Sequence, residues 1–382
     1  MEKSNERKRK LAAAVALETV TRTCATLLHI RRQYDLPSDG VDVIAKEKFE
    51  HFLNIVKAAQ RSHETEKYFG LNEENFTQIL SMCRSRDRAM RIPPDARLMV
   101  FMKYIREGRS ESYLAKDIGI SQPTVSRIVL ETIYDIAGKA SEFIRFPTSY
   151  RDIRDAEQGF LSKTDKYGRS RNVPCFGCVD GKHWATEHPP NSGSVNANYK
   201  GFFSYNSLIV CDADLRIRYL QVSELGVSND AQLYLHGKLP MLLEKAVGNA
   251  GYRLLDDEET VMPPFLLADN GFKLRKTCMQ PYRQARLTVE NMAFNRRISA
   301  VRVRVENVFG SMTSKFQVVD RKIKLSPANG RTLIAALCVV HNIQIGEVPT
   351  YQDVDDMVPV LSDPYKTAEE MREALKRYLL KN

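Results

Sequence analysis

Long apolar runs are missing from this sequence. It has no stretch of about 18 consecutive apolar residues, so we expect no membrane-spanning helix. The first ten residues are polar and basic and lead to no apolar segment with a cleavage site, so we expect no signal peptide. The seven cysteines are an odd number without regular spacing, which argues against a disulfide framework. These absences predict an intracellular protein with reduced cysteines.

Acidic residues are outnumbered: 47 Asp and Glu stand against 57 Lys and Arg, a formal net charge of +10. The excess is concentrated, because residues 271–331 contain fourteen Lys and Arg but three Asp and Glu. A basic stretch of this kind favours a polyanionic partner, double-stranded DNA first, over a merely soluble basic protein. The run Arg7–Lys10 is typical of a solvated tail, with a nuclear-import signal as the alternative.

The N-terminal part of the chain has a helical pattern. Residues 1–91 are rich in aliphatic residues and poor in Pro and Gly, and no role can be assigned to them. Pro93-Pro94 marks a boundary. We predict a separate helical unit over residues 92–147, with helices at about 96–107, 111–118 and 122–136, followed by a polar linker over 151–171.

The second and third of these helices have the pattern of a helix-turn-helix. Small Ala115, Gly119 at the turn and apolar Val125 suit the close crossing of two helices. An ordinary three-helix bundle is the alternative, because these spacings mainly report packing. In a basic protein we favour a DNA-binding domain. Three residues of its third helix are expected to point outward and contact bases and phosphates: Gln122, Thr124 and Arg127.

A strand pattern begins at Val173. Strands are predicted at 174–180, 202–211, 217–222 and 265–268, the last a fully apolar run typical of a buried central strand. A long helix is predicted from about Gln284 to Ser314, and an amphipathic helix over 365–381. This order predicts an α/β domain, a sheet covered by helices.

Three carboxylates occupy distinctive positions. Asp180 and Asp269 each follow a predicted buried strand, and Glu306 lies on the long helix. Carboxylates at the rim of a sheet can converge on hard cations, and two Mg²⁺ or Mn²⁺ ions support phosphodiester cleavage. The alternatives are turn residues before Gly for the two aspartates and an ion pair with Arg302 for Glu306.

Other candidate residues favour structural roles. Cys175 and Cys178 form a lone CxxC pair, better interpreted as buried cysteines than as zinc ligands. Asp212 is typical of a hairpin turn and is the reserve metal ligand. Asp230 is interpreted as a helix cap, and His341-Asn342 as buried hydrogen-bonding groups.

Six blocks of the sequence resemble PIF/Harbinger transposases and the nucleases domesticated from them. They are CFGCVDGKHW, YKGFFSYNSLIVCDADLRI, GVSNDAQLYLHGKL, LLADNGFKL, FNRRISAVRVRVENVFGSMTSKF and ALCVVHNI. The second-aspartate block has Gly271-Phe272 where the family usually has Gly-Tyr, and the charges at Lys182-His183 and Glu187-His188 are unusual.

The resemblance implies an RNase H-like nuclease domain over 173–346 and supports a helix-turn-helix before it. Residues 347–382, outside the resemblance, are predicted to be a tail that contains the amphipathic helix. The resemblance implies that Asp180, Asp269 and Glu306 are catalytic and bind Mg²⁺ or Mn²⁺. The expected activity is transposase-like DNA cleavage, and the alternative is a nuclear DNA-binding adaptor without nuclease activity. The resemblance also implies a Myb/SANT-like partner protein and a nuclear location, with the cytoplasm as a second location. A homo-oligomer is the other assembly considered.

The basic stretch gives one more prediction. Arg296 and Arg297 lie on the same predicted helix as Glu306, near Arg302 and Arg304. Such a density of positive charge repels itself unless anions lie nearby. We therefore predict that Arg296 and Arg297 contact DNA, whereas Arg302 can also hold Glu306 through an i, i+4 contact.

Overall fold

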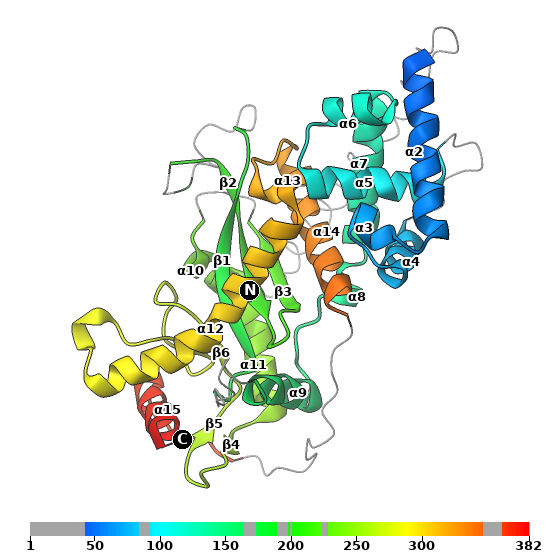
Figure 1. Ribbon diagram of the computed structural model, residues 1–382. Coiled ribbons are helices and arrows are strands. Elements are labelled where there is room, and N and C mark those ends of the chain that lie inside the picture. Colours follow the sequence, from blue (N-terminus) through cyan, green and yellow to red (C-terminus); the bar gives the residue numbers. More distant parts are fainter. Residues whose placement is uncertain are drawn as a thin grey trace, which may run out of the picture.

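A computed structural model describes residues 43–83, 92–163, 173–188, 198, 201–223, 228–346 and 361–381. Helices at the N-terminal end lie to one side of a sheet, and the long helix α12 (Val289–Lys315) crosses that sheet (Figure 1). The predicted basic run Arg7–Lys10 lies outside the described residues. No helix among the described residues is long and apolar enough to cross a membrane.

The N-terminal helices agree with the predicted pattern. They are α2 (Val43–Arg61), α3 (Thr65–Phe69), α4 (Glu73–Met82), α5 (Pro94–Glu107), α6 (Glu111–Ile118) and α7 (Gln122–Ala137). The hydroxyl of Ser121 accepts a hydrogen bond from the Thr124 amide and so caps α7. Between α6 and α7, Gly119 has φ of +83°, which an L side chain rarely adopts.

Gly119 has a second reason to be glycine. A Cβ at this position would lie 2.1 Å from the Ala45 carbonyl oxygen of α2. Helix α2 therefore packs directly on the turn between α6 and α7. Helix α7 in turn packs along α14 (Pro327–Ile345), and their side chains share one core. The domain boundaries at 92 and 147 stay a prediction.

The predicted polar linker contains a helix, and this part of the prediction is wrong. After the short α8 (Ala140–Phe143), α9 spans Tyr150–Leu161. Its Glu157 is buried and accepts a hydrogen bond from Arg253 at 2.8 Å, besides an ion pair with Arg154. The polar composition hid this helix, because its buried face contains an ion pair beside the apolar Ile153 and Phe160.

The central sheet is mixed and has five strands in the order β3-β2-β1-β6-β7. The strands are β1 (Gly177–Ala185), β2 (Ser204–Cys211), β3 (Ile217–Val222), β6 (Leu266–Leu267) and β7 (Cys278–Met279). Strands β1, β2 and β3 are antiparallel, whereas β1, β6 and β7 are parallel. A separate pair joins β4 (Arg253–Leu254) and β5 (Val261–Met262). A mixed sheet flanked by helices fits the expected α/β class.

The two faces of the sheet are covered by different helices. On one face, Cys178 and Trp184 of β1 belong to a core cluster with α12 and α14. On the other face, Val179 of β1 packs in a second cluster with α9, α10 (Asp230–His236) and α11 (Leu239–Ala250). Since side chains alternate along a strand, even-numbered residues of β1 face α12 and odd-numbered ones face α10.

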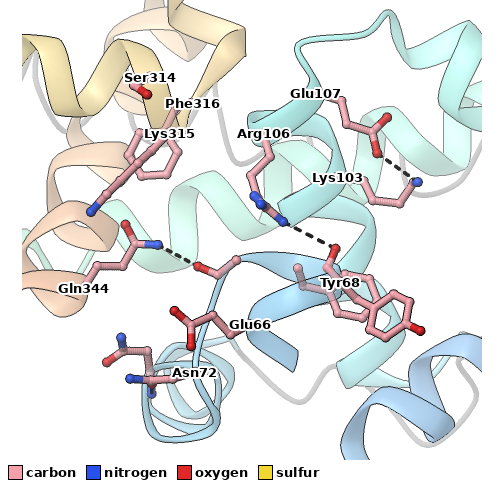
Figure 2. A pocket seen from close by; sticks show the side chains of 13 residues that line it. Glu66, Tyr68, Asn72, Lys103, Arg106, Glu107, Ser314, Lys315, Phe316 and Gln344 are labelled. Carbon is pink, nitrogen blue, oxygen red and sulfur yellow. Dashed lines mark hydrogen bonds and ion pairs between the residues drawn. The ribbon is translucent and has the colours of Figure 1, made fainter. Parts of the chain in front are cut away.

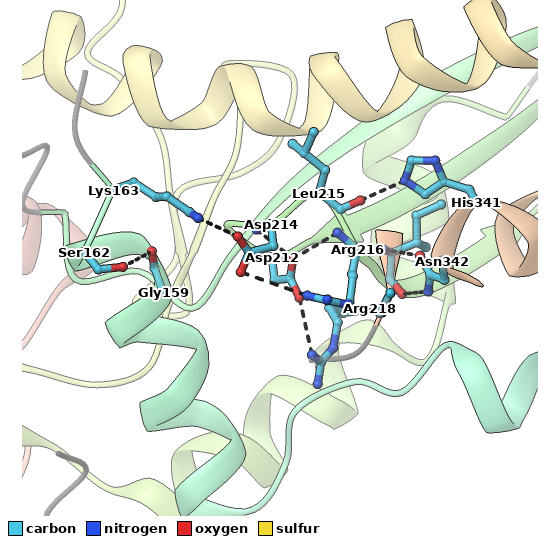
Figure 3. A network of polar contacts seen from close by, with 12 residues as sticks. Gly159, Ser162, Lys163, Asp212, Asp214, Leu215, Arg216, Arg218, His341 and Asn342 are labelled. Carbon is cyan, nitrogen blue, oxygen red and sulfur yellow. Dashed lines mark hydrogen bonds and ion pairs between the residues drawn. The ribbon is translucent and has the colours of Figure 1, made fainter. Parts of the chain in front are cut away.

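The hairpin between β2 and β3 is held by a polar network (Figure 3). Asp212 is buried and accepts hydrogen bonds from the amides of Asp214 and Arg216 and from the Arg218 side chain. Asn342 of α14 bonds both the amide and the carbonyl of Ile217. The interpretation of Asp212 as a turn residue is confirmed, because its oxygens are taken by the hairpin itself.

The C-terminal helix α15 (Ala368–Lys381) packs on α12. A short 3-10 helix, η1 (Gln284–Arg286), precedes α12 in the chain. Met371, Leu375 and Leu379 of α15 are fully buried. The expected amphipathic helix is thus confirmed. The short α13 (Gln317–Asp320) links α12 to α14.

Candidate functional site

Asp180 lies within strand β1 and not at its end. The strand continues to Ala185, and Asp180 pairs with Ile209 of β2. The prediction that β1 ends at Asp180 is wrong, and so is the alternative of a turn before Gly181. The residues after Asp180 continue the strand because they pair with a buried neighbour, β2.

Asp269 reaches the same level of the sheet from the neighbouring strand. Cys178 of β1 is paired in parallel with Leu267 of β6, and each aspartate follows two residues after its member of this pair. Parallel strands in register carry both carboxylates toward the same edge. Asp269 accepts a hydrogen bond from the Gly271 amide at 2.8 Å, which fixes the turn after β6.

Glu306 and Arg302 face Asp180 from helix α12. The predicted apolar stripe of this helix is buried: Ile298, Val301, Val305, Val308 and Met312. One Arg302 nitrogen, Nη1, lies 3.3 Å from Asp180 Oδ2, and the other, Nη2, donates to Glu306 Oε1. The predicted ion pair of Arg302 with Glu306 is confirmed, and Arg302 also extends it to Asp180.

The surroundings of Asp180 disfavour its negative charge. Burial raises the pKa of Asp180 to about 6, and the nearby charges of Asp269 and Asp230 act in the same direction. The Gly181 amide and Arg302 oppose this shift. A carboxylate that resists ionisation in this way is typical of sites that bind a cation or exchange a proton.

Asp180 is coupled electrostatically to Asp269 and is bridged to Glu306 by Arg302. These contacts do not bring the three carboxylates together as ligands of one metal ion. Among the described residues, no three His, Cys, Asp or Glu side chains are close enough to hold one metal ion. Arg302 stands between Asp180 and Glu306. The convergence of all three carboxylates on metal therefore stays a prediction.

Asp230 is the acidic neighbour that the sequence interpretation missed as part of the site. It is the first residue of α10, whose cap is Asn229, so the interpretation of Asp230 as the cap is off by one residue. Its Oδ1 accepts a hydrogen bond at 2.8 Å from the fully buried Asn206 of β2. A Cβ on Gly181 would lie 1.9 Å from that same oxygen. The Asp-Gly pair in the first block thus reflects the close approach of Asp230 from the other face.

We therefore expect Gly181→Ala to lower the free energy of unfolding by about 1–3 kcal/mol, the usual cost of overpacking. The added methyl group would force Asp230 off the strand. Gly248→Ala on α11 is the matched control, because a Cβ there meets nothing within 4 Å. Urea denaturation of both variants measures the difference, and equal stabilities would show that Asp230 moves aside at no cost.

The predicted DNA-contacting residues on α7 are placed differently from one another. Gln122 is exposed, and its Oε1 accepts a hydrogen bond from Ser112 of α6. Arg127 is half-buried, and its Nε is buried without a hydrogen-bond partner among the described residues. Thr124 is only 8% exposed and bonds Ser121, so the prediction that it points outward is wrong. A residue two positions after the first residue of the helix turns inward here to complete the cap.

The two arginines near the start of α12 also differ. Arg296 is exposed, as expected of a side chain that contacts DNA. Arg297 is half-buried, its charge acts on Tyr378 of α15, and its Nη1 is buried without a hydrogen-bond partner among the described residues. Packing of α15 on α12, which the sequence pattern could not show, removes Arg297 from the freely exposed face.

The cysteines and His341 have structural environments. Cys175 and Cys178 are fully buried, and burial raises the pKa of the Cys175 thiol. This agrees with buried cysteines and not with zinc ligands. His341 Nε2 lies 2.9 Å from the Leu215 carbonyl oxygen, and its ring is fully buried. The interpretation of His341 and Asn342 as buried hydrogen-bonding groups is confirmed.

A polar cavity of about 570 Å³ lies away from these carboxylates, between the N-terminal helices and the segment that joins α12 to α14 (Figure 2). Arg106, Lys315 and Gln344 are among its lining residues. None of the predicted site residues lines it, so it gives no support to the nuclease hypothesis.

Comparison with known proteins shows which family this part of the chain resembles. Residues 179–342, which include Asp180, Asp269 and Glu306, match the family described as DDE superfamily endonuclease. We call residues 179–342 the DDE domain, after the family that they match. This DDE domain begins within β1 and ends within α14, so it includes the five-stranded sheet except the first two residues of β1.

Similar full-length proteins point to the same family. The chain is 26% identical over 268 residues to the protein named "Putative nuclease HARBI1" of Xenopus laevis, covering 69% of this chain and 72% of that protein. The protein of the same name from Homo sapiens is also 26% identical over 268 residues, covering 69% and 71%. "Protein ALP1-like" of Arabidopsis thaliana is 23% identical over 310 residues, covering 80% and 70%. No solved structure matches the chain. The predicted resemblance to Harbinger transposase-derived nucleases is confirmed.

Proposed function

We propose that the DDE domain is a divalent-metal-dependent DNA endonuclease of the transposase-like kind. The observation that carries this proposal is the parallel pairing of β1 with β6, which brings Asp180 and Asp269 to the same level of the sheet. Glu306 is connected to Asp180 through Arg302. These three carboxylates are the proposed catalytic residues.

The donor set fits Mg²⁺ or Mn²⁺. All three side chains offer carboxylate oxygens, which hard cations prefer, and the cysteines nearest to Asp180 in the sequence are fully buried in the core. When bound, two such ions activate the attacking oxygen of a phosphodiester cleavage and stabilise the leaving oxygen. Asp180 and Asp269 would hold ions from the sheet, and Glu306 would hold them from helix α12.

The chain's own residues supply positioning for this chemistry. The Gly181 amide donates to Asp180 Oδ1 at 2.8 Å, which leaves Oδ2 as the oxygen directed to Arg302. The Gly271 amide does the same for Asp269. Each carboxylate therefore has one oxygen held by backbone, and this limits its rotation before substrate arrives.

Wild-type protein should convert supercoiled plasmid to nicked circles in the presence of Mg²⁺ or Mn²⁺ and should not do so in EDTA. The second candidate function is a DNA-binding adaptor without nuclease activity, favoured by the fact that no three described His, Cys, Asp or Glu side chains gather at one point. Plasmid binding without nicking under any of these metal conditions would support the adaptor.

Double-stranded DNA is the proposed substrate, with Gln122 and Arg127 of α7 and Arg296 of α12 as contacts. A Myb/SANT-like partner and a nuclear location are carried by the resemblance alone.

Arg296→Gln is expected to lower the slope of log affinity for duplex DNA against log salt by about one unit. One phosphate contact releases close to one counterion, and Arg296 is exposed on α12. Lys245→Gln is the matched control, since it removes the same charge from α11 on the opposite face of the sheet. Fluorescence anisotropy over a salt series measures both slopes. Equal slopes for the two variants would remove α12 from the path of the DNA.

A further inference from the structure

Arg302 makes two ion pairs at once. Its Nη1 is 3.3 Å from Asp180 Oδ2, and its Nη2 donates to Glu306 Oε1. The exposed fractions of these side chains are 20% for Arg302, 18% for Asp180 and 47% for Glu306. The guanidinium is therefore enclosed on the Asp180 side and more open on the Glu306 side.

A planar guanidinium that bridges two carboxylates uses the oxygens that a divalent cation would need. Its charge is permanent, because the arginine pKa lies far above neutral pH, so it cannot leave by losing a proton. Asp180 and Glu306 cannot close on a shared ion while Arg302 lies between them. This agrees with the absence of a three-residue metal cluster among the described residues.

We infer that Arg302 is a positioning residue that competes with the metal ion for Asp180 and Glu306. This inference rests on the proposed function and adds regulation to the same site. The bridge holds the two carboxylates in place and neutralises their repulsion. The metal ion then has to displace the guanidinium, which can move outward along the exposed Glu306 side. A phosphate group is a suitable new partner for the displaced arginine, because guanidinium binds phosphate in the same two-pronged way.

Two roles for Arg302 predict opposite changes in metal affinity when the arginine is removed. If the arginine only aligned the carboxylates, its removal would weaken metal binding, because the ligands would lose their arrangement. If it competes, its removal should tighten metal binding, because no cation has to be displaced first. A general effect of charge is a third explanation, and another arginine on the same helix can separate it.

The experiment measures Mn²⁺ affinity by calorimetric titration of the full chain without DNA. The variants are Arg302→Gln and, as the matched control, Arg304→Gln, which removes the same charge two residues along α12. Arg304 is half-buried, and its charge acts on Cys211, so it belongs to a different environment. Thermal unfolding confirms that both variants fold.

We expect Arg302→Gln to bind Mn²⁺ at least about 10-fold more tightly than wild type, a difference of about 1.4 kcal/mol. Arg304→Gln should stay within about 3-fold of wild type, because the ion pairs to Asp180 and Glu306 are made by Arg302. Unchanged or weaker binding by Arg302→Gln, or equal tightening by both variants, would overturn the competing role while leaving the proposed metal site standing. Failure of all three proteins to bind Mn²⁺ would overturn the metal site and this inference together.

Discussion

Asp180→Asn is expected to lower metal-dependent nicking of supercoiled plasmid by at least about 100-fold. Changes to residues that merely support metal ligands already cost 10- to 100-fold, and this change removes a proposed ligand itself. Asn keeps the shape of the side chain but loses the negative charge that would hold the cation and pair with Arg302.

The thermal stability of Asp180→Asn should be measured as well, to show that the variant loses activity without unfolding. Burial raises the pKa of Asp180 to about 6, so its charge is unfavourable in the folded protein at neutral pH. A neutral Asn should therefore leave the thermal unfolding temperature unchanged or slightly higher.

The matched control is Asp152→Asn, the same chemical change at an exposed position in the first turn of α9. It should nick plasmid at the wild-type rate. If Asp180→Asn nicks as fast as this control, Asp180 is not a catalytic residue, and the assignment of the DDE site in this chain fails.

Acid should weaken folding through His341 by about 3 kcal/mol between pH 7 and pH 4. Burial lowers the pKa of His341 to about 4, against an ordinary value of 6.5. Between these two values the unfolded chain binds a proton that the folded chain does not. This stability is therefore fully present above about pH 6.5 and is lost as the pH falls toward 4.

Other buried groups act in the opposite direction, so a difference between variants is needed. Burial raises the pKa of Glu157 to about 7, so its protonation favours the folded protein as the pH falls. His341→Gln keeps an amide donor for the Leu215 carbonyl but has no group that titrates in this range. The exposed His236→Gln on α10 is the matched control.

Urea denaturation at pH 7, 5.5 and 4.5 gives the free energy of unfolding for all three proteins. The stability of wild type and His236→Gln should fall relative to His341→Gln over this range. Parallel pH profiles for all three would show that His341 is protonated in the folded protein and that water or local opening reaches its ring.

Several features could be predicted from local sequence. The apolar stripe on α12 has helical spacing, and its five members are buried because that spacing places them on one side of the helix. The turn at Gly119 and the cap at Ser121 depend on the backbone chemistry of a few neighbouring residues. The run Phe265–Ala268 has no polar side chain, so a central position was the only one that suited it.

The remaining features depend on contacts between distant segments. Strand β1 continues past Asp180 because Asp180 pairs with Ile209, 29 positions away. The local sequence gave no sign of this pairing. Arg297 is half-buried because α15, a distant segment, packs against α12. Helix α9 buries the charged Arg154 and Glu157 beside its apolar Ile153 and Phe160, and only the contact with Arg253 of a distant segment explains why this charged pair is inside.

By itself, the sequence determined the resemblance to one nuclease family, because six blocks occur in order, and it determined the buried faces that periodicity marks. The three acidic positions of the site were predicted from that resemblance. Only the tertiary structure decided what surrounds those positions. It places Asp230 against Gly181 from the opposite face of the sheet and inserts Arg302 between Asp180 and Glu306. The physical reason is that a site is made of side chains from several elements, and the distance between those elements is set by packing over the whole chain and not by local spacing.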